Sequence, residues 1–76
     1  MSLRAALRHL DRGEWEQAHE LVRKDETPLF CWAHGIAHLH EGDLDNARYW
    51  LGRAGRRFTE DKDEELAALM AAAGAA

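Results

Sequence analysis

The 76-residue chain has one cysteine, Cys31, and no long apolar run. One cysteine cannot form an internal disulfide, and a lone thiol is typical of proteins from a reducing compartment. The longest weakly apolar segment, residues 66–76, is far shorter than the roughly 20 residues that a membrane span requires. The first residues also lack the continuous apolar core of a signal peptide. We therefore expect a cytoplasmic protein with no membrane association.

The chain also lacks an excess of positive charge. Its formal net charge is −4, and residues 1–58 carry nine basic and nine acidic side chains. The imbalance comes from residues 60–65, where five acids accompany one lysine. Nucleic-acid binding depends largely on neutralising phosphates, so we expect no nucleic-acid partner. The cluster of Arg53, Arg56 and Arg57 lies near a predicted helix end, where basic side chains complement the helix dipole.

No segment shows the apolar–polar alternation of a strand, so the predicted fold class is all-α. Apolar residues recur instead at helical spacing, and Gly13 and Gly42 mark helix ends. Thr27 and Pro28 form a typical helix start. We expect one domain, residues 1–76, that consists of a first helical hairpin (1–26), a second hairpin (27–58) and a C-terminal helix (59–73).

The two predicted hairpins share a pattern. A shift of 29 residues superimposes Gly13-Glu14 on Gly42-Asp43 and His9 on His38. Apolar positions coincide as well: Leu7, Leu10, Ala18, Leu21 and Val22 fall on Ile36, Leu39, Ala47, Trp50 and Leu51. A period of this size, built from two helices, predicts an array of helical hairpins.

Gly35, the Gly42-Asp43 turn, Ala47 and Ala54 together resemble a tetratricopeptide repeat. The resemblance covers residues 28–57 well and residues 1–25 loosely, and the period of 29 is shorter than the family's. Residues 32–55 are also similar to a group of short bacterial proteins with the pattern WxHAxLHxxEGDxxNAxYW, a closer likeness that implies no activity. The first resemblance implies binding of a peptide or protein rather than catalysis.

The tetratricopeptide resemblance implies that one side of each first helix lines a groove. The residues implied for this binding face are Leu3, Leu7, Leu10, Trp32, Ile36 and Leu39. A soluble monomer rarely exposes so much contiguous apolar surface. We expect the C-terminal helix, a second copy of the chain in a homodimer, or a partner's helix to cover it.

A second hypothesis rests on the five histidines. On a helical wheel Cys31, His34 and His38 share a face, and a thiolate with two imidazoles is a ligand set that zinc accepts. His19 or Glu20 from the neighbouring helix is a candidate fourth ligand. The resemblance, however, implies that Cys31, His34 and His38 pack between helices as structural residues. No glycine-rich phosphate loop is present, and nothing indicates an active-site pocket.

The sequence therefore predicts a small protein-interaction module that is not an enzyme and needs no cofactor. The alternative is a histidine-based zinc-binding or catalytic protein that uses the face of Cys31, His34 and His38.

Overall fold

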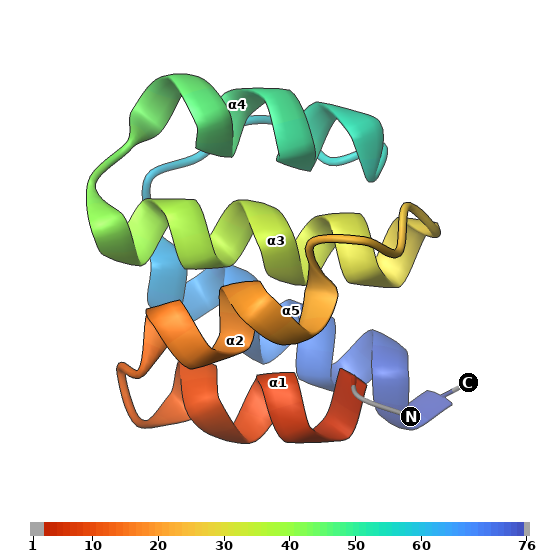
Figure 1. Cartoon of the computed structure of the whole chain (residues 1–76). Coiled ribbons are helices and arrows are strands. Elements are labelled where there is room, and N and C mark those ends of the chain that lie inside the picture. The colour runs from red at the N-terminus through yellow and green to blue at the C-terminus, as the bar shows by residue number, and fades with distance from the viewer. Residues whose placement is uncertain (1–2, 76) are drawn as a thin grey trace.

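The computed structural model describes residues 3–75, and over these residues it contains five helices and no strand. The all-α prediction is confirmed. Figure 1 shows helices α1 (Leu3–Asp11), α2 (Trp15–Val22), α3 (Pro28–Glu41), α4 (Leu44–Arg53) and α5 (Lys62–Ala75). Within the described part of the chain, none of these helices combines the length and the apolar character needed to cross a bilayer.

Two glycine turns reverse the chain between α1 and α2 and between α3 and α4. Gly13 and Gly42 both adopt left-handed backbone angles, with φ of 76° and 87°, which only glycine tolerates easily. In each turn the residue after the glycine donates its N–H five residues back, from Glu14 to His9 and from Asp43 to His38. Each turn therefore folds its second helix back along the first (Figure 1).

Helix α3 occupies the centre of the molecule. Nine consecutive residues, 31–39, are buried, so this helix has no solvent-facing side along most of its length. Figure 1 shows α4 on one side of α3 and the pair α1 and α2 on the other, and α5 also packs against α3. The central position of α3 places its side chains within reach of all four other helices.

The crossing of α3 and α4 depends on Gly35. A Cβ atom at this position would lie 2.7 Å from Leu51 Cγ and 3.0 Å from the Leu51 backbone nitrogen. Both distances are below normal van der Waals contact, so only glycine allows the two helices to approach this closely. Leu51 itself is fully buried in the resulting contact.

An ion pair between the buried Glu65 and the partly exposed Arg56 holds α5 against the rest of the fold. Glu65 is only 5% exposed and accepts hydrogen bonds from Arg56 Nε at 3.2 Å and Arg56 Nη2 at 3.0 Å. The indole N–H of Trp32 donates to the same carboxylate at 3.0 Å, and the Arg56 guanidinium lies 4.1 Å from the centre of the Trp32 ring. Glu65 thus joins α5 both to α3 and to the loop after α4.

Helix α5 covers the apolar face that the sequence predicts as a binding surface. Trp32 and Leu39 are each 8% exposed, and Ile36 is fully buried. Leu66 and Leu69 of α5 belong to the same apolar core. Leu10 is also buried, whereas Leu3 and Leu7 are half-buried. The chain's own C-terminal helix is therefore one cover of this face, and only Leu3 and Leu7 of the six predicted residues reach the surface.

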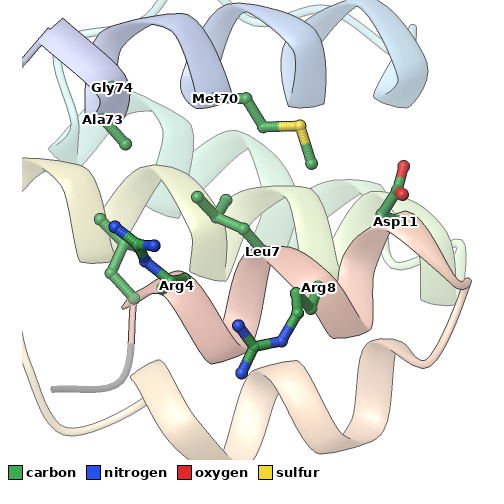
Figure 2. A pocket seen from close by; sticks show the side chains of 8 residues that line it. Arg4, Leu7, Arg8, Asp11, Met70, Ala73 and Gly74 are labelled. Atoms are coloured by element: carbon green, nitrogen blue, oxygen red, sulfur yellow. The ribbon is translucent and has the colours of Figure 1, made fainter.

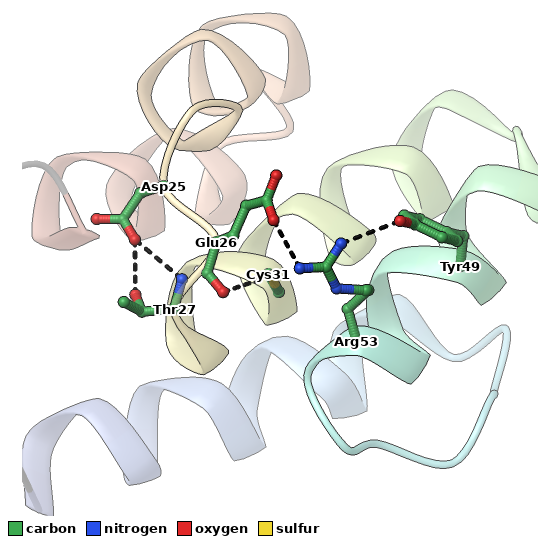
Figure 3. A network of polar contacts seen from close by, with 6 residues as sticks. All are labelled: Asp25, Glu26, Thr27, Cys31, Tyr49 and Arg53. Carbon is green, nitrogen blue, oxygen red and sulfur yellow. Dashed lines mark hydrogen bonds and ion pairs between the residues drawn. The ribbon is translucent and has the colours of Figure 1, made fainter.

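A polar network ties the segment before α3 to α4 (Figure 3). Arg53 donates to Glu26 Oε1 at 2.6 Å and to the Tyr49 hydroxyl at 3.0 Å. Hydrogen bonding to Tyr49 and Glu26 raises the pKa of Arg53 above its ordinary value. The Cys31 thiol donates to the Glu26 backbone carbonyl at 3.3 Å. These contacts fix the start of α3 against the end of α4.

Candidate functional site

Three histidines meet between α2, α3 and α4. His34 and His38 are four residues apart and therefore lie on one face of α3, and His19 faces them from α2. Each ring offers a nitrogen atom, and these three atoms lie within 4.8 Å of one another. The ring centroids are 4.6 Å apart for His19 and His34, and 5.0 Å apart for each pair that includes His38. We call these residues the histidine cluster.

Two carboxylates border the cluster at His38. Nδ1 of His38 lies 2.9 Å from Glu41 Oε1, one turn further along α3. Ligand atoms of His38, Glu41 and Asp43 also lie within 4.8 Å of one another. Since Glu41 engages Nδ1, the remaining nitrogen of His38, Nε2, is the one free to bind another group. The cluster therefore combines three imidazoles with two acids at one of its edges.

His34 is the most enclosed member of the cluster. It is 4% exposed and lies between two rings, 4.0 Å from that of Trp50 and 5.0 Å from that of His38. Burial, and to a lesser degree the nearby His19 and His38, lowers the pKa of His34 to about 3. Burial also lowers the pKa of His19, with His38 as the next cause. His34 is therefore neutral at physiological pH.

Cys31 does not belong to this site, which corrects the predicted ligand set. Its thiol hydrogen-bonds the Glu26 carbonyl at the beginning of α3, and it is in neither of the ligand groups found over residues 3–75. A helical wheel places Cys31 and His38 on one face but ignores the rise of about 10 Å over seven residues. One metal ion cannot bind two side chains whose positions lie that far apart along the helix axis. Burial raises the pKa of the Cys31 thiol, which favours its protonated form.

The predicted fourth ligand, His19, does lie with His34 and His38, but Asp43 was missed. Asp43 caps the start of α4, where its carboxylate accepts the backbone N–H of Asn46 at 3.2 Å. The left-handed turn at Gly42 folds the chain back toward His38. This turn geometry was the signal in the sequence that could have placed Asp43 beside the cluster.

A second candidate site is a groove of about 480 Å³ between α1 and α5. Figure 2 shows Leu7 of α1 and Met70 of α5 extending toward each other across it. The remaining lining residues come from the same two helices: Leu3, Arg4, Arg8, Asp11, Ala73 and Gly74. Arg4 and Arg8 are exposed and form no ion pair with any residue in the range 3–75. The groove is thus apolar inside, and two arginines and one aspartate of α1 line it.

The two sites differ in the chemistry that they support. The histidine cluster can bind a metal ion through nitrogen, because neutral imidazole is the form that coordinates metals. The groove can accept apolar side chains of a partner, and its arginines can pair with acids. Comparison with known proteins adds no constraint on this choice, because the chain matches no family model, no curated protein and no solved structure.

Proposed function

We propose that the protein is a small interaction module whose groove between α1 and α5 binds an acidic amphipathic helix of another protein. The observation that carries this proposal is an apolar interior, formed by Leu3, Leu7 and Met70, beside the exposed arginines Arg4 and Arg8. An amphipathic helix binds such a groove through apolar side chains spaced one turn apart. Acidic residues on its flanks would meet the arginines, which favours encounter and orientation.

The exposed residues favour a foreign partner over a second copy of the chain. The acidic segment 60–64 is the protein's own source of unbalanced negative charge. The exposed large apolar side chains over residues 3–75 are Leu21, Leu44, Tyr49 and Met70, and none lies in that segment. That segment of a second copy would therefore bring acids to the groove but no exposed large apolar side chain of its own.

This function needs no catalysis and no cofactor. It agrees with the binding role implied by the tetratricopeptide resemblance, although the groove lies between α1 and α5 rather than along the covered face of α3. A cytoplasmic location is part of the proposal, since the one cysteine is a free, buried thiol.

Fluorescence anisotropy with two synthetic helical peptides tests the proposal. Both peptides carry leucines one turn apart, and the flanking positions are glutamate in one and lysine in the other. We expect the glutamate peptide to bind and the lysine peptide to fail, with affinity falling as salt is added. Equal binding of both peptides, or binding of neither, would contradict the proposed recognition.

Two protein variants locate the binding surface. Met70→Glu places a charge in the groove, and Leu21→Glu is a matched control because Met70 and Leu21 are both 37% exposed. We expect the glutamate peptide to bind Met70→Glu at least about tenfold more weakly, a loss of about 1.4 kcal/mol, and Leu21→Glu unchanged. Light scattering measures self-association in parallel. A dimer that Met70→Glu dissociates would identify a second copy as the occupant and overturn the proposal.

A further inference from the structure

We propose that His19, His34 and His38 form a zinc-binding site between α2 and α3, distinct from the groove. The inference goes beyond the interaction function and depends on different residues. Three imidazoles from two helices converge, and the helices are already held together by the fold. A site of three histidines leaves a fourth coordination position open, as in many functional zinc centres.

The distances in the cluster are close to those that zinc requires. Zinc binds histidine nitrogen at about 2.0–2.1 Å, so two nitrogens in a tetrahedral site lie about 3.4 Å apart. In the structure the three nitrogens lie within 4.8 Å of one another. The site therefore needs to contract by at most about 1.4 Å, which side-chain rotation supplies without moving a helix.

Ring orientation identifies which side chains must turn. The planes of His34 and His38 are 23° apart, so their in-plane lone pairs do not yet point to one position. The His19 ring is nearly perpendicular to both, at 81° and 72°. His19 is only partly buried, so its ring is less confined than that of the buried His34. His34 is stacked on Trp50 at 4.0 Å, so metal binding that turns His34 would also change the surroundings of the Trp50 indole.

An unpaired nitrogen supports a ligand at this position. Nδ1 of His34 is buried and has no hydrogen-bond partner in the described structure. A buried polar atom without a partner carries a free-energy cost in the folded state. Coordination through this nitrogen would remove that cost. The rings of His19, His38 and Trp50 lie around His34.

The neighbouring acids complete the arrangement. Glu41 bonds Nδ1 of His38 at 2.9 Å, which fixes that ring with Nε2 available, as carboxylates hydrogen-bonded to zinc-binding histidines do. Asp43 lies in the same group of atoms and adds a second negative charge near the ion. Imidazole ligands select zinc and related transition metals, whereas magnesium and calcium prefer oxygen. The donor set therefore indicates zinc rather than an alkaline-earth ion.

Calorimetric titration of the metal-free protein with zinc chloride tests the site, and metal analysis of the gel-filtered protein gives the stoichiometry. We expect one zinc per chain. His19→Gln and His38→Gln should each reduce the affinity at least about tenfold. His9→Gln is the matched control, because His9 also bonds a glutamate, Glu14 at 2.7 Å, but lies outside the cluster. It should bind zinc as the wild type does.

Two further measurements separate a lost ligand from a lost fold. Circular dichroism checks that each variant remains helical, and Glu41→Gln keeps all three ligands while removing the carboxylate behind His38. We expect Glu41→Gln to weaken zinc binding about 10- to 100-fold with one ion still bound at saturation. The proposal is overturned if the wild type binds no stoichiometric zinc, or if His9→Gln weakens binding as much as His38→Gln.

Discussion

Replacing Gly35 with alanine provides the sharpest test of the packing between α3 and α4. The added Cβ would lie 2.7 Å from Leu51 Cγ, 2.9 Å from Leu51 Cδ2 and 3.0 Å from the Leu51 backbone nitrogen. A side-chain rotation could relieve the first two contacts, but the third involves the backbone of α4. The helix itself must therefore move, or the contact must open.

The expected magnitude follows from two opposing terms. Alanine is better than glycine in a helix by about 1 kcal/mol. Overpacking of a tight interior costs about 1–3 kcal/mol, and contact with backbone favours the upper end. We expect Gly35→Ala to lower the free energy of unfolding by about 1–2 kcal/mol. For a domain of this size, that loss corresponds to a fall in melting temperature of about 4–16 °C.

Gly52 offers a matched control on the partner helix. It lies in α4, and a Cβ there would meet nothing within 4 Å. Gly52→Ala should therefore gain helix propensity without a clash and raise the stability by about 0.5–1 kcal/mol. Urea unfolding of both variants measures the difference. If Gly35→Ala were as stable as the wild type, or if both variants changed alike, the close contact between the helices would be refuted.

Three further predictions concern ionisable groups. Because the pKa of folded His34 is about 3 and that of an unfolded histidine is near 6.5, the unfolded state takes up a proton first as the pH falls. The contribution of neutral His34 to the free energy of unfolding should be fully present above about pH 6.5. Below that pH the free energy of unfolding should fall by up to about 1.4 kcal/mol per pH unit, and urea unfolding should show a weaker fall in His34→Gln. Glu65→Ala should cost about 2–3 kcal/mol in the same assay, because the buried N–H of Trp32 and the Arg56 guanidinium lose their acceptor; a change below about 0.5 kcal/mol would contradict the fastening role of this ion pair. Asp43→Ala should lower the melting temperature because the backbone N–H of Asn46 loses its capping acceptor, and an unchanged value would argue against the cap.

Local signals in the sequence were enough to predict the helices. The glycines at positions 13 and 42 end α1 and α3 because each requires a left-handed angle, and Pro28 begins α3 as expected. The capping role expected for Thr27 is absent, since its side chain makes no cap hydrogen bond and its hydroxyl donates instead to Asp25 at 2.8 Å. Residue preference alone predicts that Thr27 can cap a helix, but it does not predict whether the Thr27 hydroxyl bonds the helix backbone or the nearby Asp25 carboxylate.

Long-range packing limited what could be predicted about the sites. Glu65 belongs to a run of acids whose sequence pattern predicts an exposed helix face. It is buried nevertheless, because Arg56 and Trp32 of other segments donate hydrogen bonds to its carboxylate. The zinc hypothesis named His19, His34 and His38 together with Cys31, and the three histidines lie near one another because helical spacing and hairpin pairing determine that contact. The zinc hypothesis included Cys31 wrongly, because two residues can share one face of a helix and still lie too far apart along its axis to bind one ion.

The burial of α3 on all sides has a consequence for how substitutions are tolerated along the chain. A helix with one buried side accepts polar replacements at most positions, and tolerance rises and falls with a period of 3.6 residues. Residues 31–39 are all buried, so this rhythm should vanish there. A saturation mutagenesis screen for folded protein should therefore show reduced tolerance with no 3.6-residue period over these nine positions. Helix α1 should keep that period, with Ala6 and Leu10 as its least tolerant positions.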